Sequence, residues 1–234
     1  MADAVRGAII AAGEGSRLRA DGYRVPKPMV EVAGLPLIGA VLRNFTAAGI
    51  TAITVILNEQ ERECVDWVRA RFPALEIDFI VKTTASSLES FREVTGRGPA
   101  GPMLVSTVDA WCAAEDFARF AAAAARRPDD VTVLAVTPFV SDEKPLRVTL
   151  GAGGRVEALG NVDSGLVTAG VYRVSDRARR VAPTRELGRL REYLGWLRES
   201  GEPMYGEIIE TVVDVDRALD VASAEALARG ARRT

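Results

Sequence analysis

A glycine-rich loop with two cations beside it carries the clearest chemical signal in the sequence. An apolar run over residues 7–12 ends in Gly-Glu-Gly-Ser-Arg at 13–17, and Lys27 follows between two prolines. Glycine lets backbone N–H groups approach an anion closely, so a loop of this kind after a strand usually receives phosphate. Arg17 offers a planar fork and Lys27 a point charge to phosphate oxygens. The pattern predicts a site for a polyphosphate.

Two other kinds of phosphate-binding loop do not fit this sequence. The dinucleotide fingerprint Gly-x-Gly-x-x-Gly needs a third glycine where Leu18 stands, and residues 19–22 are expected to be loop rather than helix. The P-loop needs Gly-Lys-Ser/Thr, which occurs nowhere in the chain. An NAD(P)-dependent oxidoreductase and a P-loop NTPase are therefore both disfavoured.

Residues 11–38 instead resemble the nucleotidyltransferase family that makes nucleotide sugars and related activated alcohols. Its members share a strand, a loop of the form Ala-Ala/Gly-Gly-x-Gly-Ser/Thr-Arg and a Lys-Pro that follows, which is Lys27-Pro28 here. The resemblance implies a GT-A or Rossmann-like α/β fold, Mg²⁺ as cofactor and an NTP as substrate. The expected reaction transfers NMP to a sugar phosphate or a polyol phosphate and releases pyrophosphate.

The amino-acid composition of the chain is compatible with such a transfer. The nucleophile is a phosphate oxygen, which is already an anion at neutral pH and needs no general base, and the chain contains no histidine. The main task is to neutralise two polyanions. The resemblance implies that Arg17 and Lys27 are the catalytic cations. Contacts to the nucleotide are expected from the loop residues Ala11, Ala12, Gly13, Glu14, Gly15 and Ser16.

Aspartates at expected strand ends are candidate Mg²⁺ ligands, since this ion is commonly held by one or two carboxylates together with substrate phosphates. Asp109 follows the apolar stretch 103–108, where the family has a metal-binding aspartate. Asp214 matches the family's second ligand best, with Asp216 as the alternative. A helix N-cap is the structural alternative for Asp109. Arg217 stands where relatives have threonine, so Asp216 could also cap the helix that follows.

The remaining substrate contacts are less specific in this sequence. The base side is expected near Lys82 and Ser87, but residues 86–90 match neither usual version of the family, so the base stays open and helix capping is an alternative for Ser86 and Ser87. Two later stretches are similar to the family's sugar-side loop and the strand after it. Candidate acceptor contacts there are Glu143, Lys144, Asn161, Asp163 and Thr168.

Two alternatives to a sugar nucleotidyltransferase remain. A similarity to cytidylyltransferases for polyol or inositol phosphates keeps a non-sugar acceptor open. A catalytically silent module that binds nucleotide sugars is the second alternative, although the presence of Arg17, Lys27, Asp109 and Asp214 together argues against it.

The elements that must position these residues follow from hydrophobic periodicity and turn signals. Alternating strands and helices predict βαβ units and a mostly parallel mixed sheet in a three-layer α/β/α sandwich. Strands are expected at 7–12, 50–57, 76–81, 102–108 and 131–136, with helices at 35–48, 60–72, 87–94 and 114–127. Beyond residue 137 the expected elements are antiparallel strands at 146–150, 156–159 and 166–172, helices at 176–181 and 186–200, a strand at 211–215 and a helix at 218–229.

Composition limits the partners and the compartment. With 30 basic and 32 acidic residues the net charge is −2, which argues against a nucleic-acid partner. No apolar run is long enough for a membrane span, and two cysteines are too few for a disulfide framework, so we expect a cytoplasmic protein. A single domain over 1–234 is expected, with a nucleotide-binding half at 1–137 and an acceptor-binding half with the C-terminal helix at 138–234. The sequence leaves the oligomeric state open.

Overall fold

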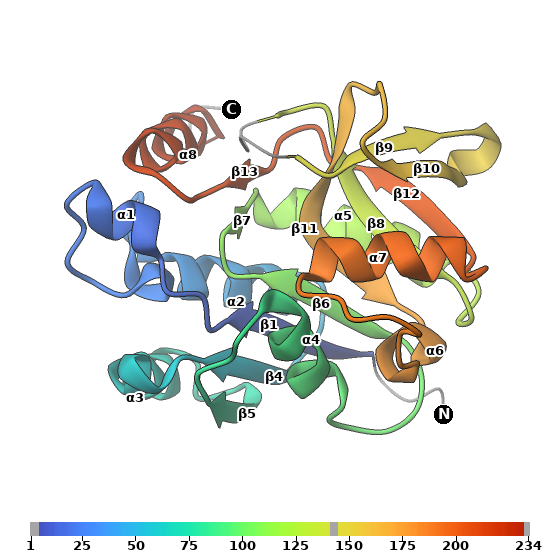
Figure 1. Ribbon diagram of the computed structural model, residues 1–234. Coiled ribbons are helices and arrows are strands. Elements are labelled where there is room, and N and C mark those ends of the chain that lie inside the picture. The colour runs from blue at the N-terminus through green and yellow to red at the C-terminus, as the bar shows by residue number, and fades with distance from the viewer. Residues whose placement is uncertain (1–4, 141–144, 232–234) are drawn as a thin grey trace.

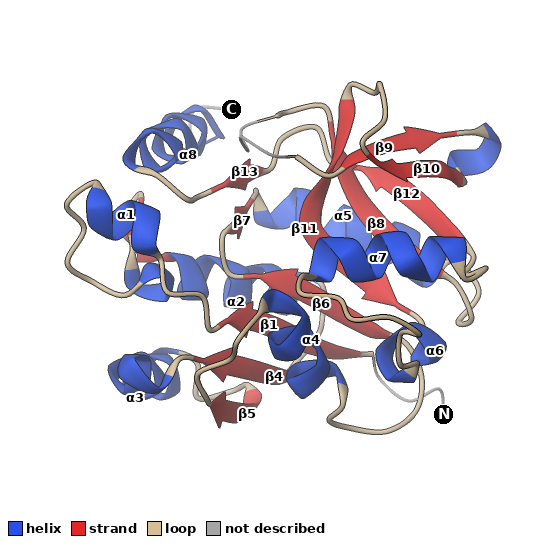
Figure 2. Ribbon diagram, viewed as in Figure 1, coloured by secondary structure: helices blue, strands red, loops and turns tan. Residues whose placement is uncertain are grey.

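A nine-stranded mixed sheet crosses the molecule, and helices cover both of its faces (Figure 1, Figure 2). The computed structural model describes residues 5–140 and 145–231. Strands and helices alternate along the first part of the chain, and antiparallel strands follow, both as the sequence predicts. The fold is therefore the expected α/β sandwich of three layers.

The first half of the chain builds a parallel sheet from four short strands. They are β1 (Arg6–Ala11), β4 (Ala52–Leu57), β5 (Glu76–Val81) and β6 (Met103–Thr107). In space their order is β5, β4, β1, β6, and each neighbouring pair is parallel. The C-terminal ends of these strands meet at one edge, where the glycine loop follows β1 and Asp109 follows β6.

Helices pack against both faces of this sheet and enclose two hydrophobic clusters. On one face lie α2 (Leu37–Ala47), α3 (Arg62–Arg71), α5 (Ala114–Ala125) and α8 (Ala218–Ala231); on the other lie α4 (Ser87–Thr95), α6 (Asp176–Arg180) and α7 (Leu190–Glu199). The ring centroids of Phe45 and Phe117 are 5.2 Å apart in the first cluster. In the second, the ring of Tyr193 lies 5.7 Å from that of Phe91 and 5.6 Å from that of Trp196.

A long central strand joins the parallel strands to the second half of the sheet. The strands of this half are β8 (Thr132–Thr137), β9 (Arg147–Leu150), β10 (Val156–Gly160), β11 (Leu166–Val174) and β12 (Met204–Ile208). Strand β11 runs antiparallel to β6, β8 and β9. β9 and β10 form a hairpin, while β12 pairs in parallel with β8.

A glycine allows β11 to pass close to the end of β6. The register of the β11–β8 pair shifts between Thr168 and Tyr172, and Gly170 within the shift has a φ of 71°, which L side chains rarely adopt. A Cβ on Gly170 would lie 2.6 Å from Oγ1 of Thr107. Irregularities of this kind re-aim side chains next to binding sites. Thr168 and Tyr172 both reach the cavity described below.

Two pairs of very short strands lie outside the main sheet. β7 (Ala110–Trp111) and β13 (Val213–Asp214) pair antiparallel, which places Asp214 opposite Ala110. This contact carries the late aspartates to the segment that follows β6. The second pair is β2 (Glu31–Val32) with β3 (Leu35–Pro36).

The structure differs from the sequence-based expectations at several element boundaries. Residues 16–20 form a short helix, α1 (Ser16–Ala20), where we expected loop. The expected strand at 211–215 is reduced to the two residues of β13, and β12 was not expected at all. α7 begins at Leu190 and not at 186, because Glu192 accepts the backbone N–H groups just before it. Short 3₁₀ turns are η1 (Lys27–Met29), η2 (Glu59–Glu61) and η3 (Ala152–Gly154).

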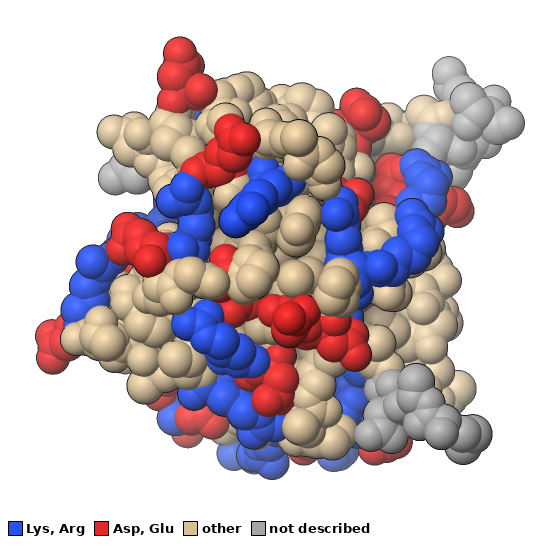
Figure 3. Space-filling model, turned by 90° about the vertical axis from the view of Figure 1, so that its right-hand side faces the viewer, with Lys and Arg blue, Asp and Glu red and all other residues tan. Residues whose placement is uncertain are grey.

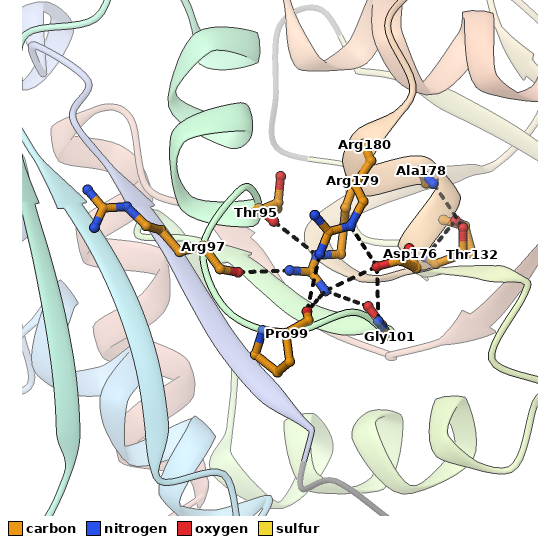
Figure 4. Close-up of polar contacts among 10 residues, drawn as sticks. Thr95, Arg97, Pro99, Gly101, Thr132, Asp176, Ala178, Arg179 and Arg180 are labelled. Carbon is orange, nitrogen blue, oxygen red and sulfur yellow. Dashed lines mark hydrogen bonds and ion pairs between the residues drawn. The ribbon is translucent and has the colours of Figure 1, made fainter.

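A buried arginine fastens α6 to the turn after α4 (Figure 4). The side chain of Arg179 is 2% exposed. Arginine carries five N–H donors in a fixed plane, which suits a site with several acceptors. The turn ends next to the first residue of β6, at the opposite edge of the sheet from the glycine loop, so this clamp serves stability. The guanidinium donates to the backbone carbonyls of Thr95, Arg97, Pro99 and Gly101.

Candidate active site

A cavity of about 260 Å³ opens where β6 and β8 end. Its wall brings together charged residues singled out in the sequence, part of β11 and the start of α7. Residues from both halves of the chain therefore meet in one concave site, as is usual for small-molecule sites. The lining includes Arg17, Ser87, Asp109, Thr168, Tyr172, Arg191, Asp214 and Asp216.

The ammonium of Lys27 is buried among carboxylates next to this cavity. Its Nζ lies 2.6 Å from Oδ2 of Asp109 and also contacts Oδ1 of Asp216. Burial by itself would lower the pKa of Lys27, but the charges of Asp109, Asp216 and Asp214 raise it above its ordinary value. Lys27 is therefore a fixed cation at neutral pH.

The glycine loop lies directly against this lysine. Gly15 has a φ of 62°, and a Cβ there would lie 2.8 Å from the Cβ of Lys27. The second glycine of the motif therefore provides both the turn and the close approach of the loop to Lys27. Ala11 and Ala12 are buried beneath the loop. Gly13, Glu14 and Ser16 are exposed.

Three aspartates gather beside Lys27 and could hold a divalent cation. Asp109, Asp214 and Asp216 each offer a carboxylate oxygen, and these oxygens lie within 4.8 Å of one another. Carboxylate oxygens are the donors that Mg²⁺ prefers. Burial would raise the pKa of Asp109, but Lys27 holds it below its ordinary value, so this carboxylate is ionised at neutral pH.

The late aspartates are held in place by the start of α8. The backbone N–H of Val215 donates to the carbonyl of Asp109 at 3.0 Å. Oδ2 of Asp220 accepts from the backbone N–H groups of Asp216 and Arg217, at 3.0 and 2.8 Å. Asp220 thus caps this end of the helix, and the carboxylate of Asp216 is directed to the cations instead of serving as the cap.

Arg17 reaches the same carboxylate from the other side. Its Nη1 lies 2.6 Å from Oδ2 of Asp216, and its side chain is 46% exposed. Lys27 and Arg17 therefore share one aspartate, and a surface arginine of this kind can turn toward an incoming anion. The three carboxylates outnumber Lys27 and Arg17, so this cluster can attract a cation.

The residues expected on the base side are only partly brought to the cavity. Ser87 lines it, and its Oγ accepts from the backbone N–H of Leu190, which joins α4 to α7. Lys82 instead forms ion pairs with Glu89 and Glu93 on α4, at 2.8 and 2.7 Å. The N-cap of α4 is Ser86, and Ser87 is its first helical residue.

The residues expected to contact the acceptor also lie in different places, and only some of them line the cavity. Thr168 lines the cavity next to the aspartates. Asn161 lines a neighbouring groove between α7 and the β9–β10 hairpin. Asp163 is exposed and belongs to neither hollow. Glu143 and Lys144 lie outside the described residues.

Two lining residues were not expected from the sequence. Tyr172 lies on β11 beyond the register shift, and burial raises its pKa to about 12, so its hydroxyl stays protonated. Arg191 stands at the start of α7 and brings a further guanidinium to the cavity. The register shift that precedes Tyr172 involves Gly170, whose lack of a side chain matters because Thr107 lies close to it in space, and this neighbour cannot be inferred from the local sequence.

Comparison with known proteins identifies the family. The model of the MobA-like NTP transferase domain matches residues 7–182, which contain the glycine loop, Lys27 and Asp109. The chain belongs to the MobA-like NTP transferase domain family. The family assignment made from residues 11–38 is thereby confirmed.

Named relatives match this chain over part of their length. The 2-aminoethylphosphonate cytidylyltransferase of Lancefieldella rimae is 30% identical over 95 residues, which is 38% of this chain and 38% of that protein. The mannose-1-phosphate guanyltransferase of Gibberella zeae is 30% identical over 115 residues, 46% of this chain and 31% of that protein. The chain thus spans well under half of these curated relatives.

Solved structures match this chain over nearly its whole length. The inositol-1-phosphate CTP transferase from T. maritima superposes with a TM-score of 0.78 at 18% identity, covering 95% of this chain and 96% of that one. This likeness supports the fold. In the part of the chain that the structure describes, no helix combines the length and the apolar character that crossing a bilayer requires.

Proposed function

We propose that this NTP transferase moves a nucleoside monophosphate from an NTP to a phosphate or phosphonate oxygen of a small acceptor. The acceptor oxygen forms a bond to the α-phosphorus, the bond from that phosphorus to the α–β bridging oxygen breaks, and pyrophosphate leaves with the electron pair. The observation that carries this proposal is the buried ammonium of Lys27, held between Asp109 and Asp216 at the edge of the cavity.

Lys27 and Arg17 would supply most of the positive charge that neutralises the substrate phosphates. Lys27 is fixed near the carboxylates, so it suits charge that develops on the α-phosphate oxygens. Arg17 is exposed enough to turn from Asp216 to the β- and γ-phosphate oxygens, where its planar fork makes paired hydrogen bonds. The loop at 11–16 would receive the rest of the triphosphate. No proton needs to be removed from a phosphate monoester at neutral pH, which fits a site without histidine.

The aspartate cluster fits Mg²⁺ as the cofactor, with Asp109 and Asp214 as its ligands. Both are oxygen donors within 4.8 Å of each other, and Asp216 is already shared by Lys27 and Arg17. When bound there, Mg²⁺ would neutralise phosphate oxygens and orient them for in-line displacement. The protein's own part is to keep these carboxylates ionised and aimed at one point.

We assign the acceptor to the β11 side of the cavity. Thr168 and the protonated hydroxyl of Tyr172 can hydrogen-bond acceptor oxygens, and Ser87 lies on the α4 side, toward the nucleotide. This division agrees with a nucleotide-binding half at 1–137 and an acceptor-binding half at 138–234. Asn161 and Asp163 are farther away and less suited to direct contact with the reacting phosphate.

Cytidylyl transfer is the specific version that we would test first. A curated relative is named a cytidylyltransferase of a phosphonate, and a solved structure with the same fold is a CTP transferase of inositol phosphate. The guanyltransferase relative acts on a sugar phosphate by its name, so a sugar acceptor is the second candidate.

The test is pyrophosphate release with each of the four NTPs against sugar 1-phosphates, polyol phosphates and 2-aminoethylphosphonate, with and without Mg²⁺. We expect release with one NTP and one class of acceptor, dependent on the metal. Nucleotide binding without release on any pair would favour the silent binding module instead.

A further inference from the structure

A second hollow continues the active-site cavity along α7. It is a groove of about 580 Å³ between this helix and the β9–β10 hairpin. Pro145, Leu146 and Arg191 line both the groove and the cavity, so the two are continuous. A molecule bound at the aspartates could therefore extend into the groove without leaving the protein surface.

One wall of the groove is a single face of α7. Its residues there include Arg191, Gly195 and Glu199, which are spaced by four and thus lie one above the other along the helix. From Arg191 to Glu199 the helix rises about 12 Å at 1.5 Å per residue. A monosaccharide phosphate seated at the aspartates would therefore leave the groove unfilled, and the groove is long enough for a more extended ligand.

Gly195 has no packing role that explains it. It lies inside α7, and a Cβ built on it would meet nothing within 4 Å. Glycine in the interior of a helix costs about 1 kcal/mol relative to alanine. Here it leaves the middle of the groove wall without a side chain, which gives a ligand access to the helix surface.

The groove has an apolar floor and charged ends. Apolar side chains of Leu146, Leu159, Leu187 and Trp196 line it. Arg191 stands at the end next to the cavity. At the other end Arg185 pairs with Glu199 at 2.9 Å. Figure 3 shows one face of the molecule, on which basic and acidic side chains lie side by side.

From these observations we propose that the groove binds the distal part of the acceptor, and that the acceptor is an elongated phosphate monoester or phosphonate with an apolar chain. This inference rests on the proposed function, because it assigns the acceptor phosphorus to the aspartate end. The chain of the acceptor lies over the apolar floor, against the open surface of Gly195. Its far end reaches the ion pair of Arg185 and Glu199.

The test uses n-alkylphosphonates as probes, from ethyl through butyl and hexyl to octyl, below their micelle concentrations. Binding to the protein saturated with a non-hydrolysable NTP analogue is measured by calorimetry, and KM by pyrophosphate release with the NTP itself. We expect affinity to rise about fourfold for each methylene that becomes buried. Equal binding of ethyl- and octylphosphonate would overturn the inference.

A substitution that fills the groove provides the second arm. In Gly195→Leu the ratio of the octyl- to the ethylphosphonate dissociation constants should approach one, because the new side chain occupies the space of the alkyl chain. Gly230→Leu is the matched control, since Gly230 is also helical with nothing within 4 Å of a built Cβ but lies on α8. Both changes improve helix propensity, so folding should be retained. An unchanged ratio in Gly195→Leu would also overturn the inference.

The two proposals can fail separately in this design. Pyrophosphate release with acceptors whose binding does not depend on chain length would leave the proposed function standing and remove the inference. Chain-length-dependent binding that is lost in Gly195→Leu, without release on any NTP and acceptor pair, would support the groove and overturn the proposed function.

Discussion

The ammonium of Lys27 lies 2.6 Å from Oδ2 of Asp109, and the same ammonium contacts Asp216. One buried cation therefore joins a carboxylate from the middle of the chain to one from near its C-terminal end. The carboxylates are also those that could hold a metal ion. Lys27 and a bound divalent cation would thus contact the same carboxylate oxygens. A triphosphate would attract both Lys27 and Arg17.

We expect this shared use of oxygens to couple metal binding to nucleotide binding. Mn²⁺ should bind weakly to the free protein and more tightly with a non-hydrolysable NTP analogue, as measured by electron paramagnetic resonance. In Lys27→Met, Mn²⁺ binding without nucleotide should tighten by about tenfold, because the carboxylates lose a neutralising charge. Lys82→Met is the control, since Lys82 pairs with Glu89 and Glu93 on α4. Equal Mn²⁺ affinity in Lys27→Met and wild type would contradict this coupling.

Removing the charge of Asp109 should stop turnover without unfolding the protein. Asparagine has nearly the same shape, so Asp109→Asn keeps an oxygen for Lys27 but loses an anionic metal ligand. We expect kcat to fall by roughly a hundredfold to a thousandfold, while the melting temperature by circular dichroism changes little. Asp163→Asn alters an exposed aspartate outside the cavity and should keep wild-type kcat. Wild-type turnover in Asp109→Asn would remove this residue from the site.

The parallel half of the fold could be predicted because buried strands leave a local signature. β1 and β4 are largely apolar runs followed by turn signals, and β6 ends two residues before Asp109. The sequence does not indicate β12 in the same way, because Met-Tyr-Gly-Glu-Ile breaks the apolar run with a glycine and a glutamate. β8 pairs with only one hydrogen-bonding edge of β12, so a polar residue is tolerated in β12.

The contacts that complete the site depend on distant pairings, which one sequence does not reveal. Asp214 reaches Asp109 through a pair of two-residue strands, too short for a periodic signal. The partner of Arg17 is likewise 199 residues away. The motif could therefore indicate which residues to consider as site candidates, but not that Lys27 and Arg17 share Asp216.

Arg179 should contribute much more to stability than its neighbour on α6. Arg179→Met removes the donor of four backbone carbonyls, of which that of Pro99 keeps a second hydrogen bond from Arg180 at 3.3 Å. Arg180 itself is 45% exposed and pairs with Asp176 at 2.9 Å. We expect Arg179→Met to lower the free energy of unfolding by about 3 kcal/mol, and Arg180→Met by less than about 1 kcal/mol. Urea denaturation measures both. Similar losses in the two variants would mean that the clamp of Figure 4 does not bear on stability.

A buried glutamate near the glycine loop makes stability depend on pH. Glu61 is 5% exposed, at the end of η2, and its Oε2 accepts from the backbone N–H of Asn58 at 3.3 Å. Burial raises its pKa from about 4.5 to about 7, against the smaller opposing effects of that hydrogen bond and of Arg19. The native state therefore keeps a proton on Glu61 over a range of pH where the unfolded chain has lost it.

We expect the free energy of unfolding of wild type to fall relative to that of Glu61→Gln as pH rises from about 4.5 to 7. The native state binds more protons than the unfolded state in this range, so its stability decreases with pH; below and above the range the difference is constant. The change should be about 3 kcal/mol. Urea denaturation across this range measures it, with Glu59→Gln, an exposed residue of the same turn, as the control. A pH-independent difference would show that Glu61 ionises at its ordinary pKa.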